Sequence, residues 1–255
     1  MRVLSVDWDY FINATLEQRL VMFPDGGNEK LPDSISDTIW AARYAEHKEL
    51  SKIGLDNSGY NKLKKIIKRY CNPDTKVFIA DSHSRAYDFI KEHDTGDEIS
   101  IVNIDFHHDY YDFQSEVNKK YTTEEDVNCG NWVRLLIDND DRISYTWVCR
   151  EDSDLSERLE FSPNFCGYKM IEDLLEESEP YDLLFICRSS VWSPPHLDHY
   201  FFQFIDNYVT AIGTESIEYG YLTKDRYNEQ MKKQIQEYAD FIETSLKEVT
   251  HGKHH

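Results

Sequence analysis

The residues of this chain best suited to chemistry alternate at the end of one apolar run. Asp105, His107 and Asp109 directly follow residues 99–104, which are rich in isoleucine and valine. In an extended backbone, residues i, i+2 and i+4 share one face, whereas on a helix they diverge. The spacing therefore predicts two carboxylates and an imidazole that converge at the end of a strand.

Two other segments offer the same residue types in the same position. Asp7 and Asp9 close the N-terminal apolar run 2–6, and His83 follows the run 76–80. The carboxyl ends of neighbouring parallel strands meet at one edge of a sheet. Several carboxylates buried side by side without a cation are strongly unfavourable, so the combination predicts a metal site rather than ordinary loop capping.

The donor types narrow the choice of metal. Carboxylate oxygens together with imidazole nitrogens suit Mn²⁺, Zn²⁺ or Fe²⁺, and the absence of clustered thiolates disfavours a structural zinc site. Six potential ligands are enough for two ions, for which Mn²⁺ is our first expectation. Two adjacent ions can lower the pKa of a water held between them and polarise the bond under attack, which predicts hydrolysis.

The elements that must position these residues belong to the α/β class. Short runs rich in valine, isoleucine and phenylalanine recur between segments of helical periodicity, which is typical of a parallel sheet flanked by helices in three layers. The runs cover residues 2–6, 76–80, 99–104, 143–148 and 181–187.

Helical segments are predicted from apolar stripes and capping residues. Leu63, Ile66, Ile67 and Tyr70 fall at i, i+3, i+4 and i+7, and Asn72-Pro73 ends that helix. Ser34 or Ser36 could cap a second helix that contains Trp40, and a terminal helix is expected over about 224–249. The polar segments 110–130 and 150–167 are predicted to be long loops. We expect a single domain over residues 1–250 and a disordered tail over 251–255.

Composition excludes several classes of partner. The formal charge is −20, from 28 basic and 48 acidic residues, which opposes binding to nucleic acid. No apolar stretch approaches the roughly 20 residues needed to cross a bilayer, so no membrane partner is expected. Five cysteines without CxxC spacing, and no apolar leader, predict reduced thiols and a cytoplasmic protein. Nothing in the sequence predicts the oligomeric state.

The three motifs resemble those of a known family. Asp105-Phe-His107-His108-Asp109 resembles the Asp-x-His-x-Asp motif of the ureohydrolases (arginase, agmatinase and their relatives), whose fold is shared with the histone-deacetylase-like enzymes. His83-Ser84 resembles the family's His-Ser, and Ser5-Val-Asp7-Trp-Asp9 resembles its Ser-x-Asp-x-Asp. The resemblance implies an arginase/deacetylase-like fold and a ureohydrolase-like or deacylase-like hydrolase.

The resemblance also implies ligand sets and roles. One ion would be held by His83, Asp105, Asp109 and Asp7, and the other by His107, Asp105, Asp7 and Asp9. The presence of both His83 and Asp109 favours this two-metal arrangement over the single zinc of the deacetylases. Asp109 could also act as general base, and His108 could orient the substrate or lie buried as an inert neighbour.

The chain departs from the family in three places, one of which is that Asp81 stands two residues before His83 rather than next to it. In ureohydrolases the Asp-x-Asp motif follows the Asp-x-His-x-Asp motif, whereas Asp7 and Asp9 come first here, which implies a permuted strand order. Val133 stands where arginase has a histidine, so arginase activity itself is not expected. Over residues 76–200 the chain is similar to an uncharacterised arginase-like family with a Gly-Asn-Trp segment, here Gly130-Asn131-Trp132, and a Trp-x-Pro-Pro segment, here Trp192-Ser-Pro194-Pro195.

Four residues are candidates to bind the substrate, which we expect to be a small molecule with a linear carbon–nitrogen bond of guanidine or amide type. They are Asn131, Arg188, Trp192 and His196. The last three follow the apolar run 181–187, where a strand would deliver them to the same rim as the metal ligands. Arg188 could pair with a substrate carboxylate.

Two other functions fit part of the same sequence. The N-terminal Val-Asp7-Trp-Asp9 also resembles the first motif of haloacid-dehalogenase-like phosphatases, with Asp7 as nucleophile, Asp9 as acid/base and Mg²⁺ as cofactor. That hypothesis leaves residues 105–109 unexplained. Lys169 and Asp140-Asp141 would have to supply that family's later motifs, but their order and strand context fit poorly. The third hypothesis is a catalytically inactive, metal-bound module that recognises a partner through its aromatic loops.

Overall fold

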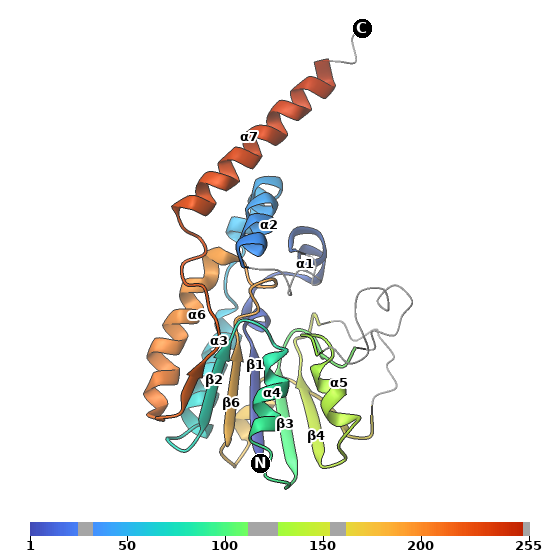
Figure 1. Ribbon diagram of the computed structural model, residues 1–255, viewed down its shortest axis with the longest axis vertical. Helices are drawn as coiled ribbons and strands as arrows, with labels where there is room; N and C mark the ends of the chain where they lie inside the picture. Colours follow the sequence, from blue (N-terminus) through green and yellow to red (C-terminus); the bar gives the residue numbers. More distant parts are fainter. Residues whose placement is uncertain (25–32, 112–126, 154–161, 252–255) are drawn as a thin grey trace.

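The computed structural model describes residues 1–24, 33–111, 127–153 and 162–251, and within this part of the chain seven parallel strands form one sheet (Figure 1). The strand order is β5-β4-β3-β1-β6-β2-β7. The strands are β1 (Arg2–Asp7), β2 (Lys76–Ala80), β3 (Ile99–Ile104), β4 (Ile143–Val148), β5 (Phe165–Lys169), β6 (Leu183–Cys187) and β7 (Ile217–Tyr219).

The five predicted strands are confirmed, and two more were missed. β5 lies within and just beyond the segment 150–167 that was expected to be a loop, so that expectation is wrong at its end. β5 and β7 are the two edge strands, and most of their residues are exposed or half-buried. An edge strand that is not buried on both faces lacks the continuous apolar run by which central parallel strands are recognised.

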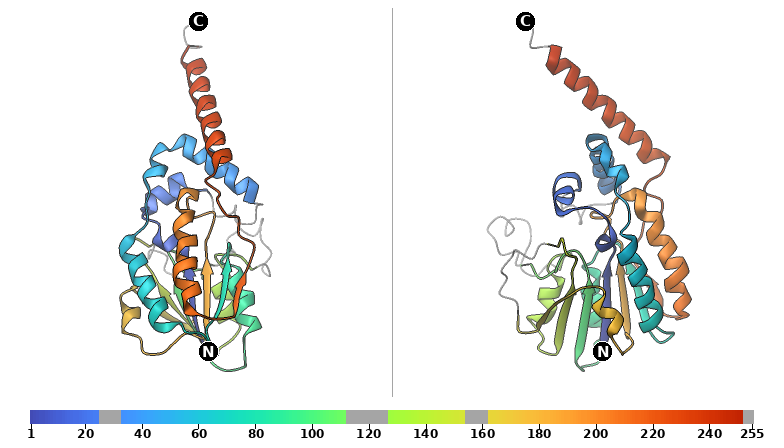
Figure 2. Two further views of the ribbon diagram at one scale, coloured as in Figure 1. Left: turned by 90° about the vertical axis from the view of Figure 1, so that its left-hand side faces the viewer. Right: turned by 180° about the vertical axis from the view of Figure 1, so that it is seen from behind.

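Helices cover both faces of the sheet, so the predicted three-layer α/β architecture is confirmed. Figures 1 and 2 show α4 and α5 on one face and α3 and α6 on the other. The helices are α1 (Leu16–Met22), α2 (Asp33–Glu46), α3 (Asn57–Tyr70), α4 (Arg85–Glu92), α5 (Trp132–Ile137), α6 (Asp198–Phe204) and α7 (Glu229–His251). Shorter turns are η1 (Trp8–Phe11), η3 (Lys48–Lys52), η4 (Asp173–Glu176), η5 (Pro195–Leu197), η6 (Ile205–Val209) and η7 (Thr210–Ile212).

Helix α3 shows how sequence and packing agree. The side chain of Asp56 accepts hydrogen bonds from the backbone N–H groups of Ser58 and Gly59 and caps the helix. Its predicted apolar stripe is buried against the sheet. The helix that contains Trp40 differs from the prediction, because α2 already begins at Asp33 and both expected capping serines lie inside it.

The C-terminal helix α7 projects from the body of the molecule, and its first half lies beside α2 (Figures 1 and 2). It begins at Glu229 rather than near 224, where the side chain of Asn228 accepts a hydrogen bond from the N–H of Met231. The helix runs to His251, and residues 252–255 of the expected tail lie outside the described residues. Among the described residues, no helix has the length and apolar character needed to cross a membrane.

Candidate metal centre

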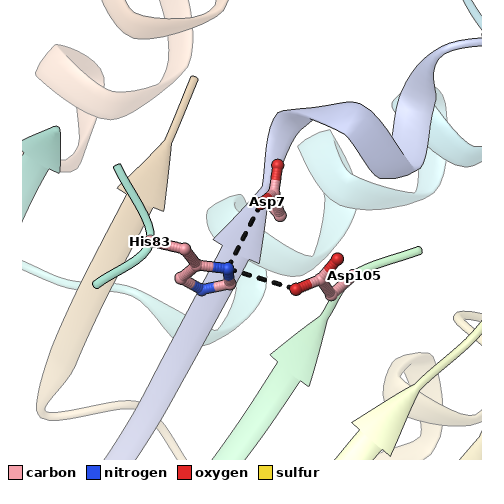
Figure 3. Close-up of side chains that lie close together, drawn as sticks. All are labelled: Asp7, His83 and Asp105. Atoms are coloured by element: carbon pink, nitrogen blue, oxygen red, sulfur yellow. Dashed lines mark ion pairs between the residues drawn. The ribbon is translucent and has the colours of Figure 1, made fainter. Parts of the chain in front are cut away.

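The strands that carry the aspartate motifs are neighbours in the sheet. β1 pairs in parallel with β3, with Val6 opposite Ile104, so Asp7 and Asp105 leave the same edge side by side. β6 lies on the other side of β1, and β2 follows it. The chain beyond β2 brings His83 back over this edge, and Figure 3 shows its imidazole between the two carboxylates.

The first group of ligands surrounds one nitrogen of His83. His83 Nδ1 lies 3.2 Å from Asp7 Oδ2, 3.1 Å from Asp105 Oδ2 and 3.0 Å from Asp109 Oδ2. All four side chains are buried, and no neighbour within the described part of the chain meets the geometry of a hydrogen bond with Nδ1. Ligand atoms about 2.1 Å from an octahedrally coordinated ion lie about 3 Å from one another. Donor atoms of Asp7, His83 and Asp105 lie within 4.8 Å of one another, so these three have the spacing of a metal site, and Asp109 adds a further contact with His83.

A second group of ligands shares Asp105 with the first. Donor atoms of Asp9, Asp105 and His107 lie within 4.8 Å of one another. His107 Nδ1 is 3.4 Å from Asp9 Oδ2 and 3.9 Å from Asp105 Oδ1. Asp105 turns one oxygen to each histidine, which is the geometry of a bridging ligand. The side chain of His107 is 25% exposed, so this end of the cluster faces solvent.

Both carboxylates expected to bridge are oriented by hydrogen bonds to both of their oxygens, but of the two, Asp105 contacts both histidines, whereas Asp7 lies with the group around His83. Asp7 Oδ1 accepts from the N–H of Asp9 at 3.0 Å, and Asp7 Oδ2 accepts from Ser189 Oγ at 2.9 Å. Asp105 Oδ1 accepts from the N–H of His107 at 2.9 Å, and Asp105 Oδ2 accepts from the Asn103 amide at 3.2 Å. These contacts hold the carboxylates in place before any ion binds.

Asp109 combines a special backbone with a strong side-chain contact. Its φ is 54°, in the left-handed region that aspartate tolerates better than most residues. Trp132 Nε1 donates a hydrogen bond to Asp109 Oδ2 at 2.6 Å. The tryptophan of the Gly-Asn-Trp segment thus aims Asp109 at His83.

Ser5 fixes the orientation of the His83 ring. Ser5 Oγ lies 2.7 Å from His83 Nε2, so His83 Nδ1 is the nitrogen that faces the carboxylates. We expect Ser5→Ala to weaken metal binding about 10- to 100-fold, the usual cost of losing a partner of a metal-bound histidine. Titration of the chelator-treated protein with Mn²⁺ measures this effect. Ser100→Ala, on the neighbouring strand but outside the cluster, is the control, and equal affinity in both variants would contradict the assigned role.

The cluster shifts the pKa values of its members. Burial, reinforced by the neighbouring carboxylates, raises the pKa of Asp7 and of Asp105 to about 7. Burial would also raise the pKa of Asp9, but contacts with His107 and Arg19 outweigh it and lower that pKa. Burial would lower the pKa of both histidines. The carboxylates reverse this effect, so the pKa of His83 lies well above its usual value and that of His107 rises to about 9.

These shifts predict that the metal-free protein loses stability as pH rises. A pKa of His107 raised from 6.5 to about 9 contributes up to about 3 kcal/mol to the free energy of unfolding. This contribution is complete below pH 6.5 and lost as pH rises through about 9. The raised pKa values of Asp7 and Asp105 act in the same direction between about pH 4 and 7. Denaturant unfolding with chelator present, at pH 6.5 and 9.5, measures this change in the free energy of unfolding. His107→Gln is the control, because without the imidazole the free energy should change less between these two pH values.

The other candidate residues lie in different surroundings. His108 is buried, its Nδ1 accepts a hydrogen bond from the N–H of Tyr110, and its ring packs on Tyr111 and Trp147. These contacts match the inert role that was one of its two expected roles. Asn131 stabilises a turn, because its side-chain oxygen accepts from the N–H of Asn128.

Arg188 and His196 are held by other parts of the protein. The guanidinium of Arg188 is fully buried against Asp81, Asp198 and the carbonyl oxygen of Thr223. The hydroxyl of Tyr44 and the carbonyl oxygen of Ile53 contact the two ring nitrogens of His196. Both residues are thus placed as structural supports rather than as substrate contacts.

Trp192 is the substrate candidate that stays beside the cluster. It is half-buried, and its ring centroid lies 5.0 Å from that of His107. Its ring borders the solvent-facing end of the metal ligands.

Several supporting residues were missed at the sequence level. Ser5 and Asn103 precede Asp7 and Asp105 by two positions, so the period of two that predicted the ligands also places these residues on the same face. Ser189 follows the apolar run 181–187, so the signal that placed Arg188 and Trp192 at this rim also covers it, and it reaches Asp7 from the loop after β6. No such signal exists for Arg19, which reaches the cluster from α1.

The described part of the chain is thus a three-layer α/β protein with a buried carboxylate–histidine cluster at the carboxyl edge of its sheet. Comparisons of the sequence with family models and with curated proteins, and of the structure with solved structures, find no match.

Proposed function

We propose that this protein is a metal-dependent hydrolase that holds two divalent ions, with Mn²⁺ the first expectation and Zn²⁺ or Fe²⁺ as alternatives. The observation that carries the proposal is the position of Asp105 between two groups of donors, one around His83 and one around His107. His83, Asp7, Asp105 and Asp109 would hold one ion, and His107, Asp9 and Asp105 the other. Bound there, two ions would polarise the scissile bond and activate a water between them.

Residues of the chain would supply the general base and the wall of the substrate site. Asp109, oriented by Trp132, is the candidate general base. Trp192 forms a wall beside His107, where substrate would enter from solvent. The proposed substrate is a small molecule with a linear carbon–nitrogen bond of guanidine or amide type, a choice that depends on the resemblance to ureohydrolases.

The phosphatase hypothesis receives less support. Lys169 lies on the edge strand β5, which β4 and β3 separate from β1, and it pairs with Glu177. Asp140 pairs with Arg142. Lys169 and Asp140 are thus paired with other residues, whereas a phosphatase of this type would need them beside Asp7.

The decisive experiment combines metal analysis with a substrate screen. Protein purified without chelators is expected to contain up to two Mn²⁺, Zn²⁺ or Fe²⁺ ions per chain and to hydrolyse a guanidine or amide substrate. Negligible metal together with Mg²⁺-dependent phosphatase activity would favour the phosphatase. Bound metal without turnover of any amide, guanidine or phosphate substrate would favour the binding module.

A further inference from the structure

A buried arginine touches one end of the ligand cluster. Arg19, on α1, is 2% exposed, and its Nη1 lies 3.3 Å from Asp9 Oδ2. Its Nη2 donates hydrogen bonds to the backbone oxygens of Asp9, at 2.8 Å, and Ile12, at 3.0 Å. The guanidinium also lies over the ring of Phe106, 3.9 Å from its centroid. The positive charge is therefore fixed in position.

Within the described segments, Arg19 makes direct contact with a carboxylate of only one of the two groups of ligands. The oxygen of Asp9 that faces Arg19 also lies 3.4 Å from His107 Nδ1. Around His83, by contrast, no lysine or arginine of the described segments pairs with Asp7, Asp105 or Asp109. The ligands around His107 thus already share a permanent cation, and those around His83 do not.

On the basis of the proposed two-ion centre, we infer that Arg19 makes the two metal positions unequal. The position at His83 retains its ion, and the position at His107 binds its ion more weakly and exchanges it with free metal. Arg19 neutralises part of the charge of Asp9 and repels a second cation across a short, buried distance. The guanidinium keeps its proton, so this repulsion is permanent.

Two unequal metal positions make the free metal concentration a control on activity. At low concentration the chain carries one ion, at His83, and the bridging carboxylate of Asp105 lacks its second partner. The two-ion form appears only when the weaker position at His107 fills. Arg19 acts through Asp9 and is therefore a positioning residue rather than a catalytic one.

Titration of the chelator-treated protein with Mn²⁺ tests this inference. Binding is measured by calorimetry and by electron paramagnetic resonance. We expect two dissociation constants that differ by about tenfold or more. His107→Gln should remove the weaker event and His83→Gln the tighter one. The spin coupling between neighbouring Mn²⁺ ions should appear only as the weaker position fills.

Substitutions of Arg19 separate its charge from its packing. Arg19→Met should tighten the weaker event about tenfold and leave the tighter one unchanged, whereas Arg19→Lys should keep the two events apart. Arg150→Met is the matched control. Arg150 also donates to the backbone oxygen of Ile12, at 2.7 Å, but it has its own partner in Asp152, so both constants should stay within about threefold.

The outcomes distinguish this inference from the proposed function. Two Mn²⁺ ions bound with equal constants in the unmodified protein, or loss of the tighter event in His107→Gln, would overturn the inference and leave the two-ion centre in place. No binding of Mn²⁺ at all would reject the centre itself. If Arg19→Met fails to fold, the dissociation constants of the unmodified protein and of the two histidine variants still test whether the two positions are unequal.

Discussion

Asp105→Asn is expected to reduce the metal content from two ions per chain to near zero. Among the residues that the structure describes, Asp105 is the one carboxylate that offers an oxygen to both histidines, so its loss removes a charged ligand from each position. Loss of a residue that hydrogen-bonds to a metal ligand typically weakens metal binding about 10- to 100-fold, and loss of a direct ligand should cost more. We therefore expect the affinity of each position for its ion to fall by more than about 100-fold. Hydrolysis should be lost with the metal.

The stability of this variant shows whether the fold survives. Burial and the neighbouring carboxylate of Asp109 raise the pKa of Asp105 to about 7, so its charge is unfavourable in the metal-free protein at higher pH. Metal-free Asp105→Asn should therefore unfold at higher denaturant concentration than the unmodified protein at pH 8. Asp109→Asn is the matched comparison, because it should weaken only the position at His83. Two ions retained in Asp105→Asn would refute a shared ligand.

Asp198→Ala is expected to lower the free energy of unfolding by about 3–5 kcal/mol. Both oxygens of Asp198 contact Arg226, each at 2.6 Å, and Arg188 approaches one of them at 3.4 Å. The carboxylate and both guanidinium groups are buried, so the substitution leaves two arginines without this partner. At this chain size the loss corresponds to a fall of roughly 10 °C in the melting temperature.

A surface ion pair of the same length is the control for that experiment. Lys62 and Glu172 are also 2.6 Å apart, but Glu172 is 56% exposed, so Glu172→Gln should cost less than about 1 kcal/mol. Thermal unfolding of the two variants, with the metal removed, gives the comparison. Similar small losses in both variants would contradict the structural role assigned to the buried Asp198–Arg226 pair.

The contacts of Asp198 also reach the metal ligands. Arg226 donates to the backbone oxygens of Ser190 and Ser193, in the same loop from which Ser189 donates to Asp7. We therefore regard the two buried arginines as the support for this loop. Arg188 follows the central strand β6 at the rim of the site, but it supports this loop and need not face a substrate.

The alternation of residues after each apolar run determined most of the candidate site. The alternation of Asp105, His107 and Asp109 grouped these residues without knowledge of the fold. They do lie together at the end of a strand, but β3 ends at Ile104, the chain bends at residues 106–107 and Asp109 has a φ of 54°, so the expected extended backbone is not what brings them together. The apolar runs also identified the five strands β1, β2, β3, β4 and β6, because strands buried on both faces need apolar residues throughout. The edge strands β5 and β7 carry no such pattern.

Only the tertiary structure decided which distant residues meet. The insertion of β6 between β1 and β2, the return of His83 over that strand, and the contact of Arg19 with Asp9 depend on strand order and on the packing of helices. The same packing turned Arg188 toward Asp81 and Asp198. Local backbone geometry sets which side chains of one strand share a face, whereas contacts between separate segments arise only when the whole chain has folded.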